Sequence, residues 1–442
     1  MTGAPAPLPD TPLLTAVLEA ARSPGIRLQT PVHQGLPAWR ERWPDWALAD
    51  VTENEATDDL GWPEGPVQSA RLALAKHFGA RASWFSVGGA TLAQQAAFWA
   101  VAVTLARRQG PPVVLVDQNA HVSVLRAMAL AGLEPVWFGG PWDANWGVRR
   151  PPRPADLARL LAEYPAIGAV HLTSPTYFGE DADLACIRAI LGDAVLVVDE
   201  AHGAHRPMAL PAGADLVVHS AHKGLGGPTQ GGYLHLGGHG VDEATVDRAM
   251  RLLQTTSPSW PLLAALDATR SAASREGGSP PVLDDWLAGL RLRPTRDPVR
   301  RLVAFPDGVA AYAALRAAGH WPEAALPRGV LLLVGGVGGE RAGLLDVGRC
   351  LRSEAERQRG LPRMPVPEPP ALGKASLGLR EASLSPSLTV PVREAVGRVA
   401  VEPICPYPPG VAVVVPGQVV SHDHLAFLDL HGALPAYLQV LP

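Results

Sequence analysis

The chain has 442 residues, of which 47% are hydrophobic and 18% charged, so it can bury a large core and form two or three domains. These proportions exclude disorder of the whole chain, and the formal net charge of -4 argues against a nucleic-acid-binding protein with a basic surface. Only three of the 38 basic residues are lysines, namely Lys76, Lys223 and Lys374. Arginine cannot replace a lysine whose amine must lose its proton and attack, so each lysine is a candidate for chemistry.

Cysteine usage and hydropathy favour a cytoplasmic protein. The three cysteines, Cys186, Cys350 and Cys405, include no CxxC pair, which indicates neither a disulfide framework nor a metal site. The proline-rich N-terminus has no apolar run of the kind found in a signal peptide. The longest apolar stretch, Ala96–Ala106, is shorter than the roughly 20 residues that span a bilayer, so we expect no membrane segment.

An N-terminal arm of irregular sequence occupies residues 1–50. It contains one helical pattern, Leu13–Arg22, and tryptophan-rich turns near Trp39, Trp43 and Trp46. No repeat with a period of 20–50 residues follows, which argues against a solenoid or a propeller.

Short β-branched runs alternate with helical patterns from about residue 66. The expected strands are Val113–Asp117, Pro135–Phe138, Ile167–Leu172, Val195–Asp199, Leu216–His219 and Tyr233–Leu236. The expected helices are Val67–Phe78, Leu92–Arg107, Val122–Ala131, Ala155–Ala162, Leu184–Leu191 and Glu243–Gln254. This alternation predicts an α/β fold with a mainly parallel, doubly wound sheet that helices cover on both faces.

The composition changes around residues 276–300, which are rich in glycine, proline and arginine. We therefore expect a major domain over residues 51–300 and a smaller α+β C-terminal domain over residues 301–442. The expected elements of the smaller domain are the helices Gly308–Ala318 and Arg341–Gln358, the strand Val330–Val334, the apolar run Val399–Ile404 and the strand Val411–Val415.

Chemistry is expected at the carboxyl ends of the strands, where open α/β sheets bind ligands. The run VLVVDEAH places Asp199 at one such end, and SAHKGLGG places Lys223 after the next strand. A Mg²⁺-dependent ATPase is excluded because the chain has no GxxxxGK[ST] loop. A strand-end aspartate followed by Ser-x-His-Lys suits pyridoxal phosphate, whose aldehyde needs a lysine and whose ring nitrogen needs a carboxylate. Considered singly, Asp199 could cap a turn and Lys223 could be a solvated loop lysine.

A cofactor with a phosphate group also needs an anion cradle. The segment VGGATL precedes a long helical pattern, and free amides at a helix start, together with the Thr91 hydroxyl, form such a cradle. The alternative is an ordinary helix entry with Thr91 as N-cap. His121 follows the strand VVLVD and could stack on a flat ring, or it could equally cap a helix or lie on the surface.

Eight segments distributed along the chain carry a resemblance to one family. They are DLGWPEGPV (59–67), GGAT (88–91), DQNAHVSV (117–124), TSPTYFGEDADL (173–184), VVDEAHGAH (197–205), DLVVHSAHKGLGGPTQ (215–230), LLQTTSPSW (252–260) and EAVGRV…PYPPG with VVVPG (394–417). Spaced and ordered in this way, they resemble the Orn/Lys/Arg decarboxylases, which are pyridoxal-phosphate enzymes of fold type I. The resemblance is to the short form, which lacks an N-terminal wing domain.

The resemblance implies a role for each matching residue. Lys223 would hold the cofactor aldehyde, Asp199 would pair with the pyridine nitrogen and His121 would stack on the ring. His202 would lie beside the cofactor, near the substrate carboxylate. The implied phosphate contacts are Ala90, Thr91, Leu92, Ser220 and His222, with Thr255 and Thr256 from a neighbouring subunit.

The implied reaction is decarboxylation of arginine, lysine or ornithine to the amine and carbon dioxide, as in polyamine biosynthesis. The implied assembly is a cytoplasmic homodimer or dimer of dimers with the active site at the interface, and with no nucleic-acid or membrane partner. A basic substrate needs an acidic group at its far end. Glu402, before the PYPPG motif, would supply it, or would be an ordinary surface glutamate.

The sequence departs from the family pattern at three further places, and two alternatives stay open, the first because such enzymes share the Asp-to-Lys spacing and the second because of PVHQG. PVHQG at residues 31–35 replaces PGHKxG, Ala90 replaces a threonine, and Gln94 replaces an asparagine. One alternative is another fold-type-I reaction, by an aminotransferase or an acyl-transferring synthase. The other is a degenerate paralogue that keeps the fold without turnover.

Overall fold

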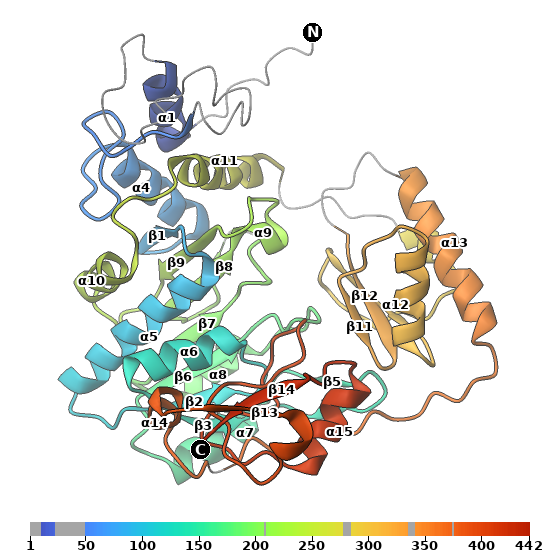
Figure 1. Cartoon of the computed structure of the whole chain (residues 1–442). Helices are drawn as coiled ribbons and strands as arrows, with labels where there is room; N and C mark the ends of the chain where they lie inside the picture. The colour runs from blue at the N-terminus through green and yellow to red at the C-terminus, as the bar shows by residue number, and fades with distance from the viewer. Residues whose placement is uncertain (1–9, 23–48, 207–208, 277–283, 335–340, 374) are drawn as a thin grey trace. The chain divides into compact units, whose positions relative to one another are not determined.

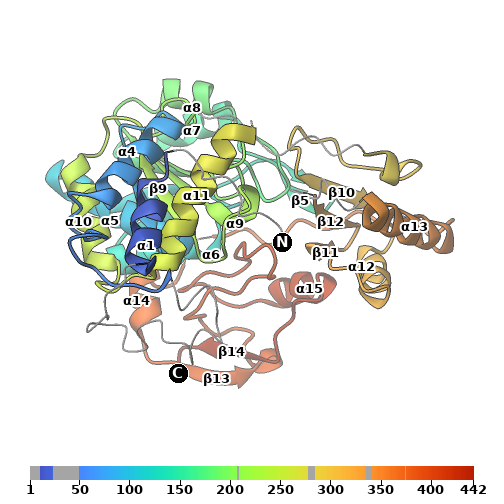
Figure 2. The ribbon, with the colours of Figure 1, turned by 90° about the horizontal axis from the view of Figure 1, so that it is seen from above.

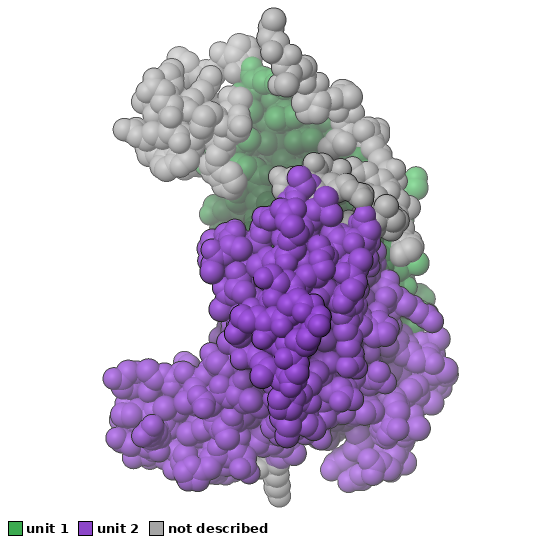
Figure 3. Space-filling view, turned by 90° about the vertical axis from the view of Figure 1, so that its right-hand side faces the viewer, with its two compact units in different colours: residues 1–100, 200–278 green, residues 101–199, 279–442 purple. Residues whose placement is uncertain are grey.

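The computed structural model describes residues 10–22, 49–206, 209–276, 284–334, 341–373 and 375–442 (Figure 1). Contacts divide the chain into two compact units (Figure 3). Unit 1 comprises residues 1–100 and 200–278, and unit 2 comprises residues 101–199 and 279–442. The PVHQG segment, the turns at Trp39, Trp43 and Trp46, and Lys374 lie outside the described residues.

Seven strands form one sheet in the order β1-β9-β8-β7-β6-β2-β3. Their bounds are β1 Ala82–Ser86, β2 Val113–Asp117, β3 Glu134–Phe138, β6 Ala169–Thr173, β7 Val195–Asp199, β8 Leu216–Ser220 and β9 Gly232–Leu236. In unit 2, β2 pairs in parallel with β3 and β6, and β6 with β7. In unit 1, β9 runs antiparallel to both β1 and β8. The predicted mainly parallel α/β sheet is confirmed.

Helices alternate with these strands, and every predicted helix of this region is present. Their bounds are α4 Pro66–Phe78, α5 Gly89–Arg107, α6 Val122–Ala131, α7 Pro154–Glu163, α8 Leu184–Ile190, α9 Ala221–Gly224, α10 Glu243–Leu253 and α11 Trp260–Glu276. By length and composition α5 could cross a membrane, but 56% of its apolar window is buried inside the protein, as in a core helix. The exposed Lys76 lies on α4.

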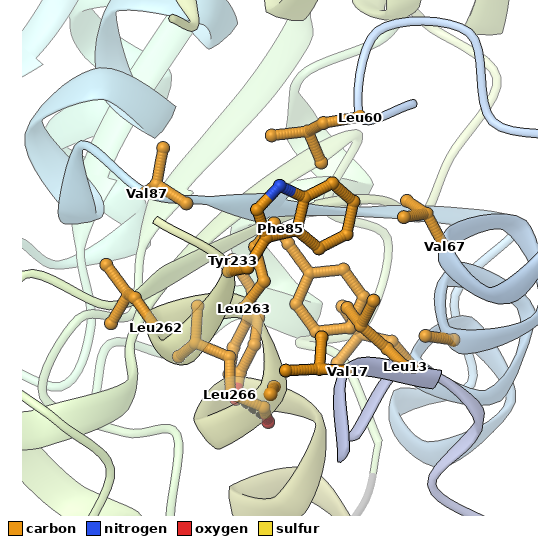
Figure 4. Packing of buried hydrophobic residues seen from close by; sticks show 14 of the residues in the cluster. Leu13, Val17, Leu60, Val67, Phe85, Val87, Tyr233, Leu262, Leu263 and Leu266 are labelled. Atoms are coloured by element: carbon orange, nitrogen blue, oxygen red, sulfur yellow. Dashed lines mark hydrogen bonds between the residues drawn. The ribbon is translucent and has the colours of Figure 1, made fainter. Parts of the chain in front are cut away.

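The core of unit 1 lies where α1 (Pro12–Arg22), α4 and α11 pack beside β1 (Figures 1, 2 and 4). Pro66 occupies the first turn of α4, and Gly79 ends that helix with a φ of 65°. The Asp267 carboxylate accepts hydrogen bonds from the amides of Leu13 and Leu14, at 3.1 and 3.3 Å. A side chain of α11 thereby satisfies free amides at the start of α1, which helps to hold the predicted N-terminal helix in place.

Unit 2 continues beyond its part of the large sheet. Two short strands, β4 Trp142–Asp143 and β5 Val148–Arg149, form a hairpin. A three-stranded antiparallel sheet with its helices comprises η1 Asp284–Leu287, β10 Arg300–Ala304, α12 Gly308–Ala317, β11 Ala324–Leu326, β12 Gly329–Leu333 and α13 Arg341–Arg357. The C-terminal elements are α14 Leu379–Leu384, β13 Leu388–Pro391, η2 Val392–Glu394, α15 His422–Leu430 and β14 Tyr437–Val440.

The strand predicted at Val411–Val415 is wrong, and the apolar run Val399–Ile404 forms no strand either. Single β-bridges join Val411 to His121 and Val414 to Ile404 instead. The two valines therefore pair with different parts of the chain, and the preceding Pro406, Pro408 and Pro409 have no amide to donate. These valines are nonetheless in or near the core, because Val413 and Val414 are buried.

Candidate active site

Lys223 lies in α9, the short helix that follows β8 directly (Figure 1). Its Nζ is 3.3 Å from Nε2 of His202. His202 belongs to the turn that follows Glu200, in which the amide of Gly203 donates to the Glu200 carbonyl at 2.8 Å. An amine and an imidazole at this distance can exchange a proton, which a lysine must lose before it acts as a nucleophile.

Ser220 and His222 lie on either side of the turn from β8 into α9. The Ser220 hydroxyl is 3.2 Å from Nδ1 of His222. Partial burial of the ring and the charge of Lys223 lower the pKa of His222 below its usual value. The imidazole is therefore neutral near pH 7 and has a single N–H to donate. Ser220 is the last residue of its strand and is fully buried.

The predicted phosphate loop forms the first turn of α5, which begins at Gly89 and not at Leu92. Thr91 is thus inside the helix, and its alternative role as N-cap is wrong. Gly89 has a φ of +70°, and a Cβ built on Gly232 would lie 2.7 Å from the Ala90 amide nitrogen. The loop backbone therefore lies directly against the start of β9. The ladder pairs Gly232 with Ser220, so Ala90 and Ser220 lie at the same edge of the sheet.

Gln94, one turn further along α5, is a residue to which sequence reasoning gave no role. Its side chain is fully buried, and neither its amide nitrogen nor its oxygen has a hydrogen-bond partner. A buried amide without a partner is unfavourable unless a ligand or water satisfies it. Gln94 therefore marks this helix start as a place where a ligand is expected.

Thr255 and Thr256 are exposed residues that follow α10. Gln254 holds this segment, because its side chain accepts from the Val87 amide at 3.2 Å and donates to the Phe85 carbonyl at 3.1 Å. Both threonines line a unit 1 cavity of about 240 Å³. Among the described residues, no hydrogen bond joins either threonine to Lys223 or to the start of α5. Their exposure is compatible with the predicted contact to a neighbouring subunit.

Asp199 is the last residue of β7 and belongs to unit 2, where it is 5% exposed. It pairs with Thr173 across the ladder, and its carbonyl accepts from the Ser174 amide at 3.1 Å. The predicted strand-end placement of this carboxylate is confirmed. Its side chain has further interactions, so it is not a free carboxylate.

Asp117 is a second buried carboxylate at a strand end of unit 2, where the sequence predicts chemistry without a specific role for this residue. Its two oxygens accept from the amides of Asn119, at 2.9 Å, and Thr173, at 3.4 Å. Burial raises the pKa of Asp117 to about 7, although these amides and the charge of Arg149 oppose the shift. Asp117 thereby joins the segment that follows β2 to the end of β6.

His121 is the N-cap of α6, because its Nδ1 accepts from the Ser123 amide at 3.2 Å. The alternative that it caps a helix is thus confirmed, and the cap turns the Nε2 edge of the ring away from the helix start. That edge faces Gly410, where a Cβ would lie 2.8 Å from both Cδ2 and Nε2 of His121. The Val122 amide donates to the Gly410 carbonyl at 2.8 Å. The PYPPG motif therefore packs on His121, a contact that sequence reasoning missed.

Glu402 is exposed, and no hydrogen bond or ion pair involves its carboxylate among the described residues. It does not line the cavity of about 100 Å³ in unit 2 that Gln118, Asn119, Tyr177 and the prolines of PYPPG enclose. Arg149 and His431 are the ionisable bases in the described wall of that cavity, and no carboxylate belongs to it. The predicted acidic partner thus lies outside this pocket.

Comparisons with known proteins agree with this arrangement. The model of the major domain of the Orn/Lys/Arg decarboxylases matches residues 11–286, and that of their C-terminal domain matches residues 383–442. The uncharacterized protein YaaO of Bacillus subtilis strain 168 is 28% identical, over 97% of this chain and 96% of that protein. An arginine decarboxylase of Bacillus anthracis is 29% identical, over 96% and 94%. The constitutive lysine decarboxylase of E. coli has a similar fold, with a TM-score of 0.74 at 18% identity over 98% of this chain and 82% of that one.

Proposed function

The chain belongs to the Orn/Lys/Arg decarboxylase family, whose members are pyridoxal-phosphate-dependent carboxy-lyases, and we propose that it converts arginine, lysine or ornithine into the amine and carbon dioxide. The observation that carries this proposal is the pair formed by Lys223 Nζ and His202 Nε2 at 3.3 Å, directly after a buried strand. We place the reaction in the cytoplasm, in a homodimer or dimer of dimers.

The residues of unit 1 fit pyridoxal phosphate. The first turn of α5 offers amides that no earlier turn of the helix can satisfy, and Gly88 and Gly89 keep side chains away from them. Gln94 adds a buried amide that has no partner among the described residues. In our proposal Ala90, Thr91, Leu92, Ser220 and His222 hold the phosphate, with Thr255 and Thr256 of a neighbouring subunit.

The remaining roles follow the chemistry of the side chains. Lys223 would hold the aldehyde, Asp199 would pair with the pyridine nitrogen and His121 would stack on the ring. When bound, pyridoxal phosphate accepts the electron pair that the departing carbon dioxide leaves behind. His202 accepts a proton from Lys223 Nζ, which makes the amine nucleophilic, and returns it when the amine is displaced. The neutral His222 supports Ser220 without adding a charge.

Recognition of the substrate's basic end is assigned to Glu402 in this proposal. Its carboxylate is exposed and unpaired among the described residues, so it is available to an ammonium or guanidinium group. A charge-assisted hydrogen bond of this kind is about twice as strong as a neutral one.

Assays of purified protein with pyridoxal phosphate test the proposal. We expect carbon dioxide and the matching amine from at least one of arginine, lysine and ornithine, and no product from Lys223→Ala. Keto acid formation without carbon dioxide would replace the proposal with an aminotransferase. Cofactor binding without turnover of any of the three would replace it with a degenerate paralogue.

A further inference from the structure

Four polar side chains form a hydrogen-bonded line inside unit 1. The Ser83 hydroxyl is 2.7 Å from Nδ1 of His235, whose Nε2 is 3.1 Å from Nδ1 of His219. Nε2 of His219 is 2.8 Å from the Glu200 carboxylate. The four residues are at most 8% exposed, and Phe78 packs against both imidazoles with ring centroids 4.7 Å away. The line crosses three strands, because Ser83 is on β1, His235 on β9 and His219 on β8.

The chemistry of the end groups gives this line a direction. The Glu200 carboxylate only accepts, so Nε2 of His219 carries a proton. Nδ1 of a neutral His219 must then accept from Nε2–H of His235, and Nδ1 of His235 accepts from the Ser83 hydroxyl. Burial, followed by the neighbouring His219 and His77, lowers the pKa of His235 well below its usual value, so His235 has a single N–H to give. Each ring nitrogen of the line then has a partner.

Two side-chain contacts join residues 200–203 to residues 219–223. One is the pair His219–Glu200 at 2.8 Å, and the other is the pair Lys223–His202 at 3.3 Å. The Glu200 amide also donates to the Val218 carbonyl at 3.0 Å. The pair His219–Glu200 therefore fixes the turn that carries His202 against the strand that presents Lys223.

We propose that His219 is a positioning residue, which holds the buried Glu200 carboxylate in place and thereby sets the position of the Lys223–His202 pair and of the negative charge beside it. His235 and Ser83 fix the tautomer in which His219 donates to Glu200. The inference rests on the proposed function, because it concerns the same lysine. It also concerns the protein without cofactor, where the line of hydrogen bonds is already present.

The helices α4, α11 and α9 carry the titratable and charged groups that surround this line of hydrogen bonds. On α4, burial, Arg270 and His219 lower the pKa of His77 to about 4, so this imidazole stays neutral. On α11, Arg270 pairs with Asp267 at 3.0 Å, and α9 contributes His222 and Lys223. Within the line of hydrogen bonds itself, Glu200 supplies the acidic side chain. Removal of the His219 imidazole leaves this carboxylate without the donor that holds it in place.

The pH titration of the visible absorbance of bound pyridoxal phosphate tests the positioning role. A negative charge held in place nearby favours the protonated form of the chromophore at Lys223, so removing or displacing the Glu200 carboxylate lowers the titration midpoint. We expect His219→Leu and Glu200→Gln each to lower the midpoint by roughly one unit, and the double variant to lower it no further. His219→Gln, which can still donate to Glu200, should stay near the wild-type midpoint.

Histidine nitrogen NMR of the cofactor-free protein tests the line of hydrogen bonds on its own. At pH 8 we expect both His219 and His235 to carry their proton on Nε2. The inference is overturned if His219 carries its proton on Nδ1 alone, if folded Glu200→Gln keeps the wild-type midpoint, or if the effects of the two single variants add. Should His219→Leu not fold, Glu200→Gln and His219→Gln still decide the outcome. Failure to bind any pyridoxal phosphate would instead refute the proposed function.

Discussion

Gly410 of the PYPPG motif is the position at which a single methyl group should disturb the site most directly. Its φ is +79°, and a Cβ there would lie 2.8 Å from two ring atoms of His121 and 2.9 Å from Cε2 of Tyr407. Tyr407 is 76% exposed and can turn away, whereas His121 is held as the N-cap of α6. The methyl group must therefore displace the PYPPG backbone or the His121 ring.

Gly397 provides a matched control for this substitution. Its φ is +83°, but a Cβ there has no atom within 4 Å. A left-handed alanine costs about 1 kcal/mol at either position, and overpacking at Gly410 adds about 1–3 kcal/mol. We expect Gly410→Ala to destabilise the protein by about 2–4 kcal/mol and Gly397→Ala by about 1 kcal/mol.

Urea unfolding and titration with pyridoxal phosphate measure the two parts of this prediction. The affinity for the cofactor should fall in Gly410→Ala alone, because only this variant moves His121. Equal losses of stability in the two glycine variants, together with equal cofactor affinity, would show that the contact between PYPPG and His121 is unimportant.

Three further predictions concern single side chains. Glu402→Gln should raise KM for the preferred basic amino acid by roughly tenfold at unchanged kcat, because it removes a charge-assisted hydrogen bond. The control Glu394→Gln, at another exposed glutamate, should leave both constants unchanged. Equal KM values for wild type and Glu402→Gln in steady-state assays would exclude Glu402. Asp117 keeps its proton to about pH 7 in the folded protein but loses it near pH 3.8 when the chain is unfolded. The free energy of unfolding should therefore fall by at most about 4 kcal/mol as the pH rises between these values. In urea unfolding, this fall should be smaller for Asp117→Asn, and an equal fall in the variant would contradict the prediction. Gln94→Met should stabilise the cofactor-free protein by about 1–2 kcal/mol, because it replaces a buried amide without a hydrogen-bond partner by an apolar side chain, and it should weaken pyridoxal phosphate binding. A lower urea midpoint for the variant than for the wild-type protein would show that the amide has a partner.

The apolar runs of the sequence were sufficient to locate the main elements. Val113–Asp117, Val195–Asp199 and Val122–Ala131 have the predicted bounds, because each is a continuous buried run or a clear helical pattern between polar turns. The strand Ala82–Ser86 was missed, since ASWFS contains no β-branched residue, although all five residues are buried. Burial in a sheet is decided by neighbouring elements, and local propensity cannot show it.

Some residues of the site could likewise be located from the sequence, and others could not. Lys223 and Asp199 were recognisable because Asp199 ends a buried strand and Lys223 follows the next one. The contact of Gly410 with His121 and the line from Ser83 to Glu200 depend on which segments meet in space. A signal for the second was present in the sequence, since two histidines, His219 and His235, interrupt otherwise apolar strands. A polar side chain in a fully buried strand needs a partner, so such pairs merit a search for one.

Release of labelled carbon dioxide tests the central claim most directly. Purified protein with pyridoxal phosphate is given arginine, lysine or ornithine labelled in the carboxyl group, beside the variant Lys223→Arg, which keeps the positive charge but cannot hold the aldehyde. We predict labelled carbon dioxide and an equal amount of amine from at least one substrate with the wild-type protein, and none with the variant. Release at the same rate by both proteins, or by neither when the cofactor is bound, would contradict the account.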